Sequence, residues 1–204
     1  PAGYVAPYAR RIKETTGLPV IATGRIGQPQ IAEAIVAAGD ADLCGMTRAL
    51  ICDPQMPAKT RDGNLDEIRA CIACNQACIG RAHAGMPISC IQYPESGREI
   101  EYGVLSPTKS PKSVMVVGGG PAGLKAAAVA AERGHRVTLY EASDQLGGQA
   151  LLAQKLPGRE EFGGIIQNLV REAEQAGVSL LTRSPVDVAT IKAAEPDALI
   201  LATG

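Results

Sequence analysis

The stretch SVMVVGGGPAG, residues 113–123, decides the fold of the second half of the chain. Its first residues are mostly apolar and β-branched, which predicts a buried strand, and the glycines that follow form the pattern G-x-G-x-x-G. That pattern alone is weak. However, the alanine-rich stretch Pro121–Arg133 predicts a helix directly after it, and Arg136–Glu141 predicts a second strand. Strand, glycine loop, helix and strand together predict a βαβ unit that binds a dinucleotide.

Each glycine of the motif has a mechanical role in such a loop. Gly118 permits the tight turn, Gly120 lets the backbone approach a pyrophosphate, and Gly123 lets the helix pack closely on the sheet. The helix N-terminus would stabilise the phosphate charge, and Glu141 would accept hydrogen bonds from a ribose hydroxyl. The alternative is a glycine-rich turn before an ordinary helix, and the complete βαβ context argues against it.

Four of the six cysteines form the pattern C-x2-C-x3-C-x11-C: Cys71, Cys74, Cys78 and Cys90. A secreted disulfide framework would spread its cysteines through a small loop-rich domain, so this clustering indicates metal ligation instead. Zinc sites more often use two C-x2-C pairs. Here three cysteines crowd one end and a distant fourth closes the site, which favours an iron–sulfur cluster. Zinc and four unrelated reduced thiols stay open as alternatives. The other two cysteines, Cys44 and Cys52, are expected to be a core thiol and a loop thiol.

The beginning of the chain shows a second strand–helix–strand alternation. Leu18–Ala22 and Ala41–Met46 are predicted strands, and Gln30–Ala38 between them has helical spacing. This alternation predicts a parallel sheet. Asp53–Gly63, with two prolines and a glycine, is expected to be a connector, and Pro94–Pro111 is expected to be a domain linker.

Two arginines come just after these strands, at the end where parallel α/β sheets bind ligands. Arg25 follows Gly24, and Arg48 follows Thr47. Such arginines can grip a phosphate bidentately with help from backbone N–H groups. From position alone, a pair of surface arginines in ion pairs fits equally well.

The composition excludes several function classes. The net formal charge is -1 and 46% of the residues are hydrophobic, which is ordinary for a globular protein and gives no indication of nucleic-acid binding. No apolar run is long enough to span a bilayer and no signal peptide is visible, so we expect a cytoplasmic protein without membrane contacts.

Taken together, the segments TGRI, DADLCGMTRALICDP, CIACNQAC, VVGGGPAG, TLYE, GGQ and DALILATG resemble a known family. They are similar to the multidomain relatives of old yellow enzyme, which include 2,4-dienoyl-CoA reductase, trimethylamine dehydrogenase and other NADH:flavin oxidoreductases. The resemblance implies an α/β fold in three parts. Residues 1–60 would be the last two βα units of an FMN-binding TIM barrel, and residues 61–111 would be a [4Fe–4S] segment with a linker. Residues 112–204 would be a Rossmann-like domain for FAD or ADP, which ends before the family's NAD(P)H segment.

The resemblance also implies the site residues. The FMN phosphate would lie at Gly24, Arg25, Thr47 and Arg48. The [4Fe–4S] cluster would be bound by Cys71, Cys74, Cys78 and Cys90. The FAD or ADP would contact Gly118, Gly120, Pro121, Ala122, Gly123, Glu141, Gly148, Gln149, Arg159, Val186, Thr203 and Gly204.

The implied activity is that of an NAD(P)H-dependent flavin oxidoreductase. Electrons would pass between NAD(P)H, FAD, the [4Fe–4S] cluster and FMN to reduce an enoyl- or dienoyl-type small molecule. One alternative is an amine dehydrogenase or demethylase of the trimethylamine dehydrogenase branch. Another is an electron-transfer subunit resembling the small subunit of glutamate synthase. A third is a nucleotide-binding module that is stabilised by a structural zinc ion and has no redox activity. The family's proton donor lies earlier in the barrel, so no catalytic residue is assigned, and association with further copies of the chain is left open.

Overall fold

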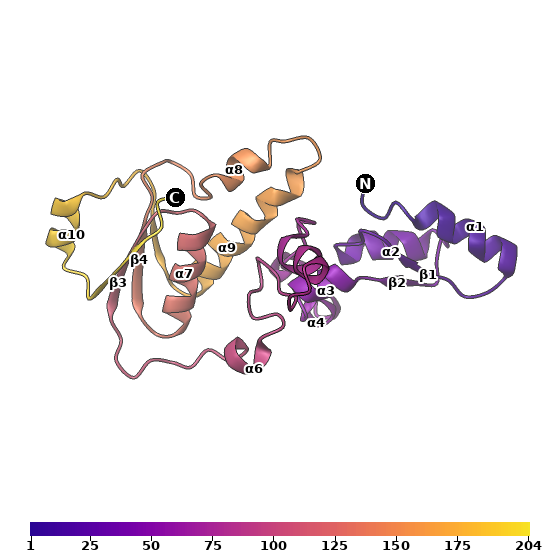
Figure 1. The fold of residues 1–204 in the computed structure, drawn as a ribbon, viewed down its shortest axis with the longest axis horizontal. Helices are drawn as coiled ribbons and strands as arrows, with labels where there is room; N and C mark the ends of the chain where they lie inside the picture. Colours follow the sequence, from indigo (N-terminus) through magenta and orange to yellow (C-terminus); the bar gives the residue numbers. More distant parts are fainter. The chain divides into compact units, whose positions relative to one another are not determined.

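The computed structural model describes every residue from Pro1 to Gly204, in two compact units, Pro1–Glu101 and Tyr102–Gly204. Each unit contains one wholly parallel sheet, so the predicted α/β class with parallel sheets is confirmed (Figure 1). The boundary between the units falls inside the predicted linker, whereas the division into three functional parts stays a prediction. None of the helices combines the length and apolar character needed to cross a bilayer.

The second unit is built on a four-stranded sheet of order β5-β4-β3-β6. Its strands are β3 (Ser113–Val117), β4 (Arg136–Tyr140), β5 (Ser179–Leu181) and β6 (Ala198–Leu201). Helix α7 (Pro121–Glu132) packs on this sheet, and helix α9 (Gly163–Gln175) lies beside α7 (Figure 1). Val116, Leu124 and Leu139 are completely buried between sheet and helix. The helix and strands predicted around the glycine loop are therefore confirmed to within one residue.

Shorter elements complete the second unit. They are α8 (Ala150–Ala153), a 3-10 turn (Glu160–Phe162) and α10 (Val188–Ala194). The last of these has a side-chain cap, because the Asp187 carboxylate accepts a 2.7 Å hydrogen bond from the backbone N–H of Thr190. A further short helix, α6 (Glu99–Tyr102), lies in the predicted linker.

The first unit begins with a small α/β layer. Its elements are α1 (Ala6–Thr16), β1 (Ile21–Thr23), α2 (Pro29–Ala37), β2 (Leu43–Gly45), α3 (Thr47–Cys52) and α4 (Met56–Arg61). Strand β1 starts later than predicted, because the backbone N–H of Val20 donates to the Asp42 carboxylate instead of to a neighbouring strand. The interpretation of Asp53–Gly63 as a connector was wrong. Helix α4 forms there, since Pro57 occupies its first turn, where a missing N–H costs nothing.

The cysteine segment contains turns and short helices rather than strands. It comprises a 3-10 turn (Leu65–Glu67), a π-helical turn (Gln76–Gly80) and α5 (Arg81–His83). Ala73 and Asn75 adopt left-handed backbone conformations, with φ of 52° and 59°. For a residue with a Cβ this conformation is unfavourable, so surrounding contacts must hold the loop in place.

Candidate cofactor sites

The register of the second sheet brings three chain segments to one edge. Val117 pairs with Tyr140 on one side and with Leu201 on the other, so β3, β4 and β6 end level with one another. Gly118 directly follows β3, and a Cβ there would overlap the carbonyl oxygen of Ala202 after β6. A Cβ at Gly123 would overlap the carbonyl oxygen of Gly118. The turn and the helix start therefore pack too closely for any residue but glycine.

Gly120 differs from these glycines because it faces open space. A Cβ built on it would meet no atom within 4 Å, and its extended backbone leads into α7 at Pro121. No side chain caps α7. The first-turn N–H groups and the positive end of the helix dipole are thus available to an anionic group beside Gly120. This geometry fits a pyrophosphate.

The carboxylate of Glu141 reaches the glycine loop from the end of β4. Its two oxygens accept hydrogen bonds from the backbone N–H groups of Gly119 (2.7 Å) and Ser143 (2.8 Å). Partial burial raises the pKa of Glu141, but these hydrogen bonds together outweigh burial and hold the pKa below its ordinary value. The group is therefore an ionised acceptor at neutral pH, as binding of ribose hydroxyls requires.

Two further segments, both predicted from the sequence to contact the nucleotide, lie against this loop. The N–H of Gly147 donates a 2.8 Å hydrogen bond to the carbonyl oxygen of Gly119, and Gly148 packs against Gly120. Gln149 follows as the residue before α8. On the β6 side, the backbone nitrogen of Thr203 lies next to Gly118. The loop is thus flanked by the GGQ segment and by the ATG segment, residues 202–204.

Two other predicted contact residues lie elsewhere on the unit. Arg159 is exposed, and its guanidinium carbon lies 5.4 Å from the centre of the Phe162 ring, a cation–π contact. Val186 is half-buried in the segment between β5 and α10. A nucleotide contact for either residue stays a prediction.

The first unit has a corresponding edge. Strands β1 and β2 pair in parallel with Thr23 opposite Gly45, so Arg25 and Arg48 both come just after the level strand ends. Gly24 packs against Val5, and a Cβ there would meet the valine side chain. The structure thereby brings the predicted phosphate residues to one edge, as parallel pairing requires.

Arg48 also reaches the cysteine segment. Its Nη1 donates a 2.6 Å hydrogen bond to the side-chain oxygen of Asn75, between Cys74 and Cys78. Burial raises the pKa of Cys71, and the positive charge of Arg48 partly opposes that rise. This residue therefore links the strand edge to the cysteine loop.

Thiols of the motif act on one another electrostatically. Burial raises the pKa of Cys71 and of Cys74, and charge on Cys90 adds to both effects. Charge on Cys78 also acts on Cys74. No three His, Cys, Asp or Glu side chains stand close enough together to hold a single metal ion. The donor set is chemically suited to a soft metal, but a metal centre stays a prediction.

Two family models match separate segments of the chain. The family model described as NADH:flavin oxidoreductase / NADH oxidase family matches residues 4–67, and the one described as pyridine nucleotide-disulphide oxidoreductase matches residues 112–204.

The chain belongs to the NADH:flavin oxidoreductase / NADH oxidase family.

Individual relatives align over nearly the whole length of the chain. An NADH oxidase from Thermoanaerobacter brockii is 42% identical over 99% of the chain and 31% of the relative. An N,N-dimethylglycine/sarcosine dehydrogenase from Chromohalobacter salexigens is 44% identical over 96% and 28%. The structure of a 2-naphthoyl-CoA reductase complex matches with a TM-score of 0.91 and 34% identity, over 100% of the chain and 31% of that structure. The chain therefore spans about a third of the length of the relatives it matches.

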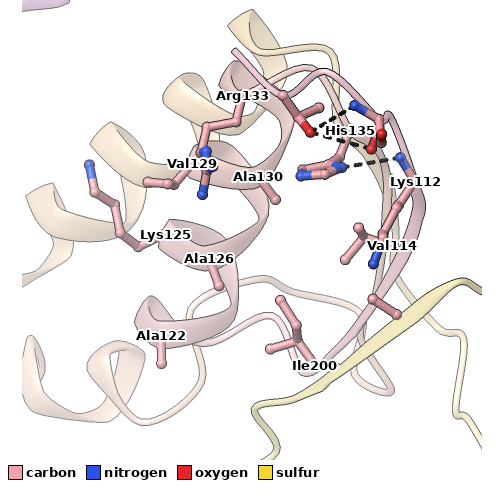
Figure 2. Close-up of a pocket in the computed structure, with 13 residues that line it drawn as sticks. Lys112, Val114, Ala122, Lys125, Ala126, Val129, Ala130, Arg133, His135 and Ile200 are labelled. Carbon is pink, nitrogen blue, oxygen red and sulfur yellow. Dashed lines mark hydrogen bonds between the residues drawn. The ribbon is translucent and has the colours of Figure 1, made fainter. Parts of the chain in front are cut away.

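A cavity of about 800 Å³ in the second unit touches the glycine loop only at Ala122. It runs along α7, with Val114, Ala126 and Ile200 on its apolar side and Lys112 and Arg133 at its polar end (Figure 2). Neither Glu141 nor Gly120 lines it. The open helix N-terminus and the ionised carboxylate meet at the glycine loop, so that loop stays the predicted nucleotide site.

The sequence analysis missed a buried polar network beside the cysteines. Cys52 was expected in a loop but ends α3 with only 1% of its surface exposed. The neighbouring Asp53 is 2% exposed and accepts hydrogen bonds from Lys59 Nζ (2.7 Å) and from the backbone N–H of Arg69 (2.9 Å). Gln92 is buried as well, and its side chain bonds to Cys52 Sγ. An aspartate directly after an apolar helix end was the available signal, but its partners lie 6 to 16 residues away.

The pKa of Cys90, beside this network, is lowered to about 6. Interaction with the Cys52 thiol is the largest cause, burial opposes it, and the backbone N–H groups of Gln92 and Tyr93 lower the pKa further. The same interaction and burial raise the pKa of Cys52. Cys90 is therefore favoured as a thiolate, the form that binds metals.

Proposed function

We propose that this chain is the cofactor-binding part of a flavin oxidoreductase that takes electrons from NAD(P)H. The observation that carries the proposal is the open position at Gly120, in front of the uncapped start of α7 and beside the ionised Glu141. That combination suits the pyrophosphate and ribose of FAD or ADP. The predicted contacts of Pro121, Ala122, Gln149, Thr203 and Gly204 extend the same cradle.

A [4Fe–4S] cluster is proposed at Cys71, Cys74, Cys78 and Cys90. The mutual effects of these thiols on one another's pKa values support a common site. The spacing C-x2-C-x3-C-x11-C favours a cluster over zinc, because zinc sites more often use two C-x2-C pairs.

FMN is proposed at the other edge, with its phosphate held by Gly24, Arg25, Thr47 and Arg48. In the two-stranded sheet there, Ile21 and Leu43 are 61% and 60% exposed. Two strands do not make a stable sheet, and a parallel sheet normally has both faces covered. These exposed side chains support the proposal that β1 and β2 belong to a larger barrel.

The chemistry of the whole protein follows from these cofactors. When bound, the flavins supply hydride and one-electron chemistry and the cluster supplies one-electron transfer. Reduction of an enoyl- or dienoyl-type substrate is our first candidate, since a naphthoyl-CoA reductase shares the fold of the chain. Amine oxidation is the second candidate, because the similarity to a dimethylglycine/sarcosine dehydrogenase is equally extensive.

Cofactor analysis of the full-length protein, purified without oxygen, tests the proposal. We expect a brown protein that releases FMN together with FAD or ADP, contains about four iron and four sulfide per chain, and bleaches on addition of NADH or NADPH. Turnover with an enoyl-CoA or with a methylated amine then separates the two candidates. A colourless protein that contains zinc and no flavin would exclude the oxidoreductase.

A further inference from the structure

The cysteine loop borders both segments that follow the strands of the first unit. After β1, a Cβ built on Gly27 would lie 3.6 Å from the carbonyl oxygen of Cys71. After β2, Arg48 Nη1 donates a 2.6 Å hydrogen bond to the side-chain oxygen of Asn75. The edge proposed for the FMN phosphate therefore meets the cysteine loop at two points.

The partner of Arg48 is a neutral amide, which distinguishes this contact from ion pairs of the same unit. Lys13 pairs with Asp42 at 2.7 Å, and Lys59 pairs with Asp53 at 2.7 Å. A carboxylate neutralises the cation that it orients, whereas an amide oxygen orients the cation and leaves its charge in place. The contact with Asn75 thus keeps the positive charge of Arg48 available to an anion.

The geometry of a guanidinium allows a second contact at the same time. Its five N–H groups form a planar fork, and the hydrogen bond to Asn75 uses only Nη1. The edge formed by Nε and Nη2 carries two parallel donors, which match two oxygens of a phosphate. The donor set of Arg48 therefore fits a phosphate while Asn75 holds the remaining nitrogen.

The side chain of Asn75 is not needed for the shape of its loop. The residue has a φ of 59°, a left-handed conformation that glycine adopts most readily and asparagine tolerates. The backbone is also fixed by the N–H of Gly80, which donates a 2.8 Å hydrogen bond to the carbonyl oxygen of Asn75. Glycine would satisfy this backbone but would offer Arg48 no acceptor. What asparagine adds at this position is the contact with the arginine.

We propose that Asn75 is a positioning residue for the FMN phosphate, because its side-chain oxygen holds the Arg48 guanidinium at the phosphate edge without adding negative charge. An arginine that is oriented in advance loses less conformational entropy when an anion binds. The inference rests on the proposed function, since it requires the FMN phosphate at Arg48.

Binding of FMN and of riboflavin to the full-length protein, freed of its FMN, tests this role. Riboflavin lacks the phosphate, so the ratio of the two dissociation constants isolates the contribution of the phosphate. Asn75→Gly removes the acceptor and suits the backbone, whereas Asn75→Asp keeps an acceptor but adds a negative charge. Asn64→Gly is the matched control, since Asn64 is an exposed loop residue of the same unit, directly before the turn Leu65–Glu67.

We expect Asn75→Gly to weaken FMN binding by about tenfold and to leave riboflavin binding unchanged. Asn75→Asp should also weaken FMN binding selectively, because its carboxylate neutralises Arg48. Asn64→Gly should keep both wild-type constants. Wild-type affinity for FMN in Asn75→Gly overturns the inference. So does an equal loss of affinity for both flavins, because that result indicates a general disturbance of the loop.

A double-mutant cycle supplies a second criterion. Arg48→Ala should remove the preference for FMN over riboflavin, and adding Asn75→Gly should cost no further FMN affinity, because the asparagine acts through the arginine. Fully additive losses overturn the inference. If Asn75→Gly does not fold, Asn75→Asp decides: a loss confined to FMN supports the role, and equal losses for the two flavins overturn it.

Failure of the proposed function gives a different result. Wild-type protein that binds riboflavin as tightly as FMN has no phosphate site at Arg48, and the proposed FMN site then fails together with this inference. A wild-type preference for FMN that persists unchanged in Asn75→Gly overturns this inference alone.

Discussion

Arg48 Nη1 donates a 2.6 Å hydrogen bond to the side-chain oxygen of Asn75, which lies between two cysteines of the motif. Arg48 belongs to the first turn of α3, directly after β2, whereas Asn75 sits in a loop with a left-handed backbone. One side chain thus connects the edge proposed for the FMN phosphate with the loop proposed for the cluster.

Loss of this connection should impair cluster loading. Asn75→Gly removes the hydrogen bond but accommodates the φ of 59°, while Asn75→Ala also adds a backbone penalty of about 1 kcal/mol. We expect both variants to contain less iron and sulfide per chain than wild type, and the alanine variant to contain the least. Metal analysis of the full-length protein measures this, and a glycine variant with full iron content would show that the hydrogen bond is dispensable.

Gly120 and Gly123 offer a matched pair for the nucleotide site. A Cβ at Gly123 overlaps the carbonyl oxygen of Gly118, so Gly123→Ala should destabilise the unit by about 1–3 kcal/mol. A Cβ at Gly120 meets nothing, so Gly120→Ala should unfold at the wild-type temperature yet bind FAD or ADP at least tenfold more weakly. Thermal unfolding and nucleotide titration test the pair. Wild-type nucleotide affinity in Gly120→Ala would place the pyrophosphate elsewhere.

Glu141 should make the stability of the second unit dependent on pH. Its pKa in the folded protein lies below the ordinary value of 4.5, so its stabilisation is fully present above that value and is lost as the pH falls through the folded pKa. Glu141→Gln should therefore cost about 1 kcal/mol at pH 7 and progressively less in acid. Urea unfolding at a series of pH values measures the difference. A cost that is independent of pH would contradict this assignment.

Asp53 should be essential for the stability of the first unit. Its carboxylate is 2% exposed and pairs with Lys59 at 2.7 Å, so Asp53→Asn leaves a partly buried ammonium without its counter-charge. We expect a loss of about 3 kcal/mol, the low end for a buried pair, because Lys59 is still 23% exposed. The free energy of unfolding in guanidinium chloride is measured for Asp53→Asn and for Asp53→Asn/Lys59→Met. The double variant should recover part of the lost stability, because it no longer contains the unpaired ammonium.

The sequence by itself determined the α/β class of the fold. It also determined which end of each parallel sheet carries the predicted cofactor residues. Around the glycine loop, β3, α7 and β4 form where the pattern places them, because glycine spacing, apolar runs and helix ends are local properties. Local patterns were less reliable between residues 53 and 63, where two prolines hid the short helix α4. Its formation depends on its contacts with the rest of the unit.

Only the tertiary structure decided which groups face one another. It brought Glu141 onto Gly119, Arg48 onto Asn75, and Gln92 onto Cys52. The partners in these pairs are 22, 27 and 40 residues apart. No local periodicity encodes such separations, because hydrogen-bond partners across a fold are selected by strand register and by burial of polar groups that must then be satisfied.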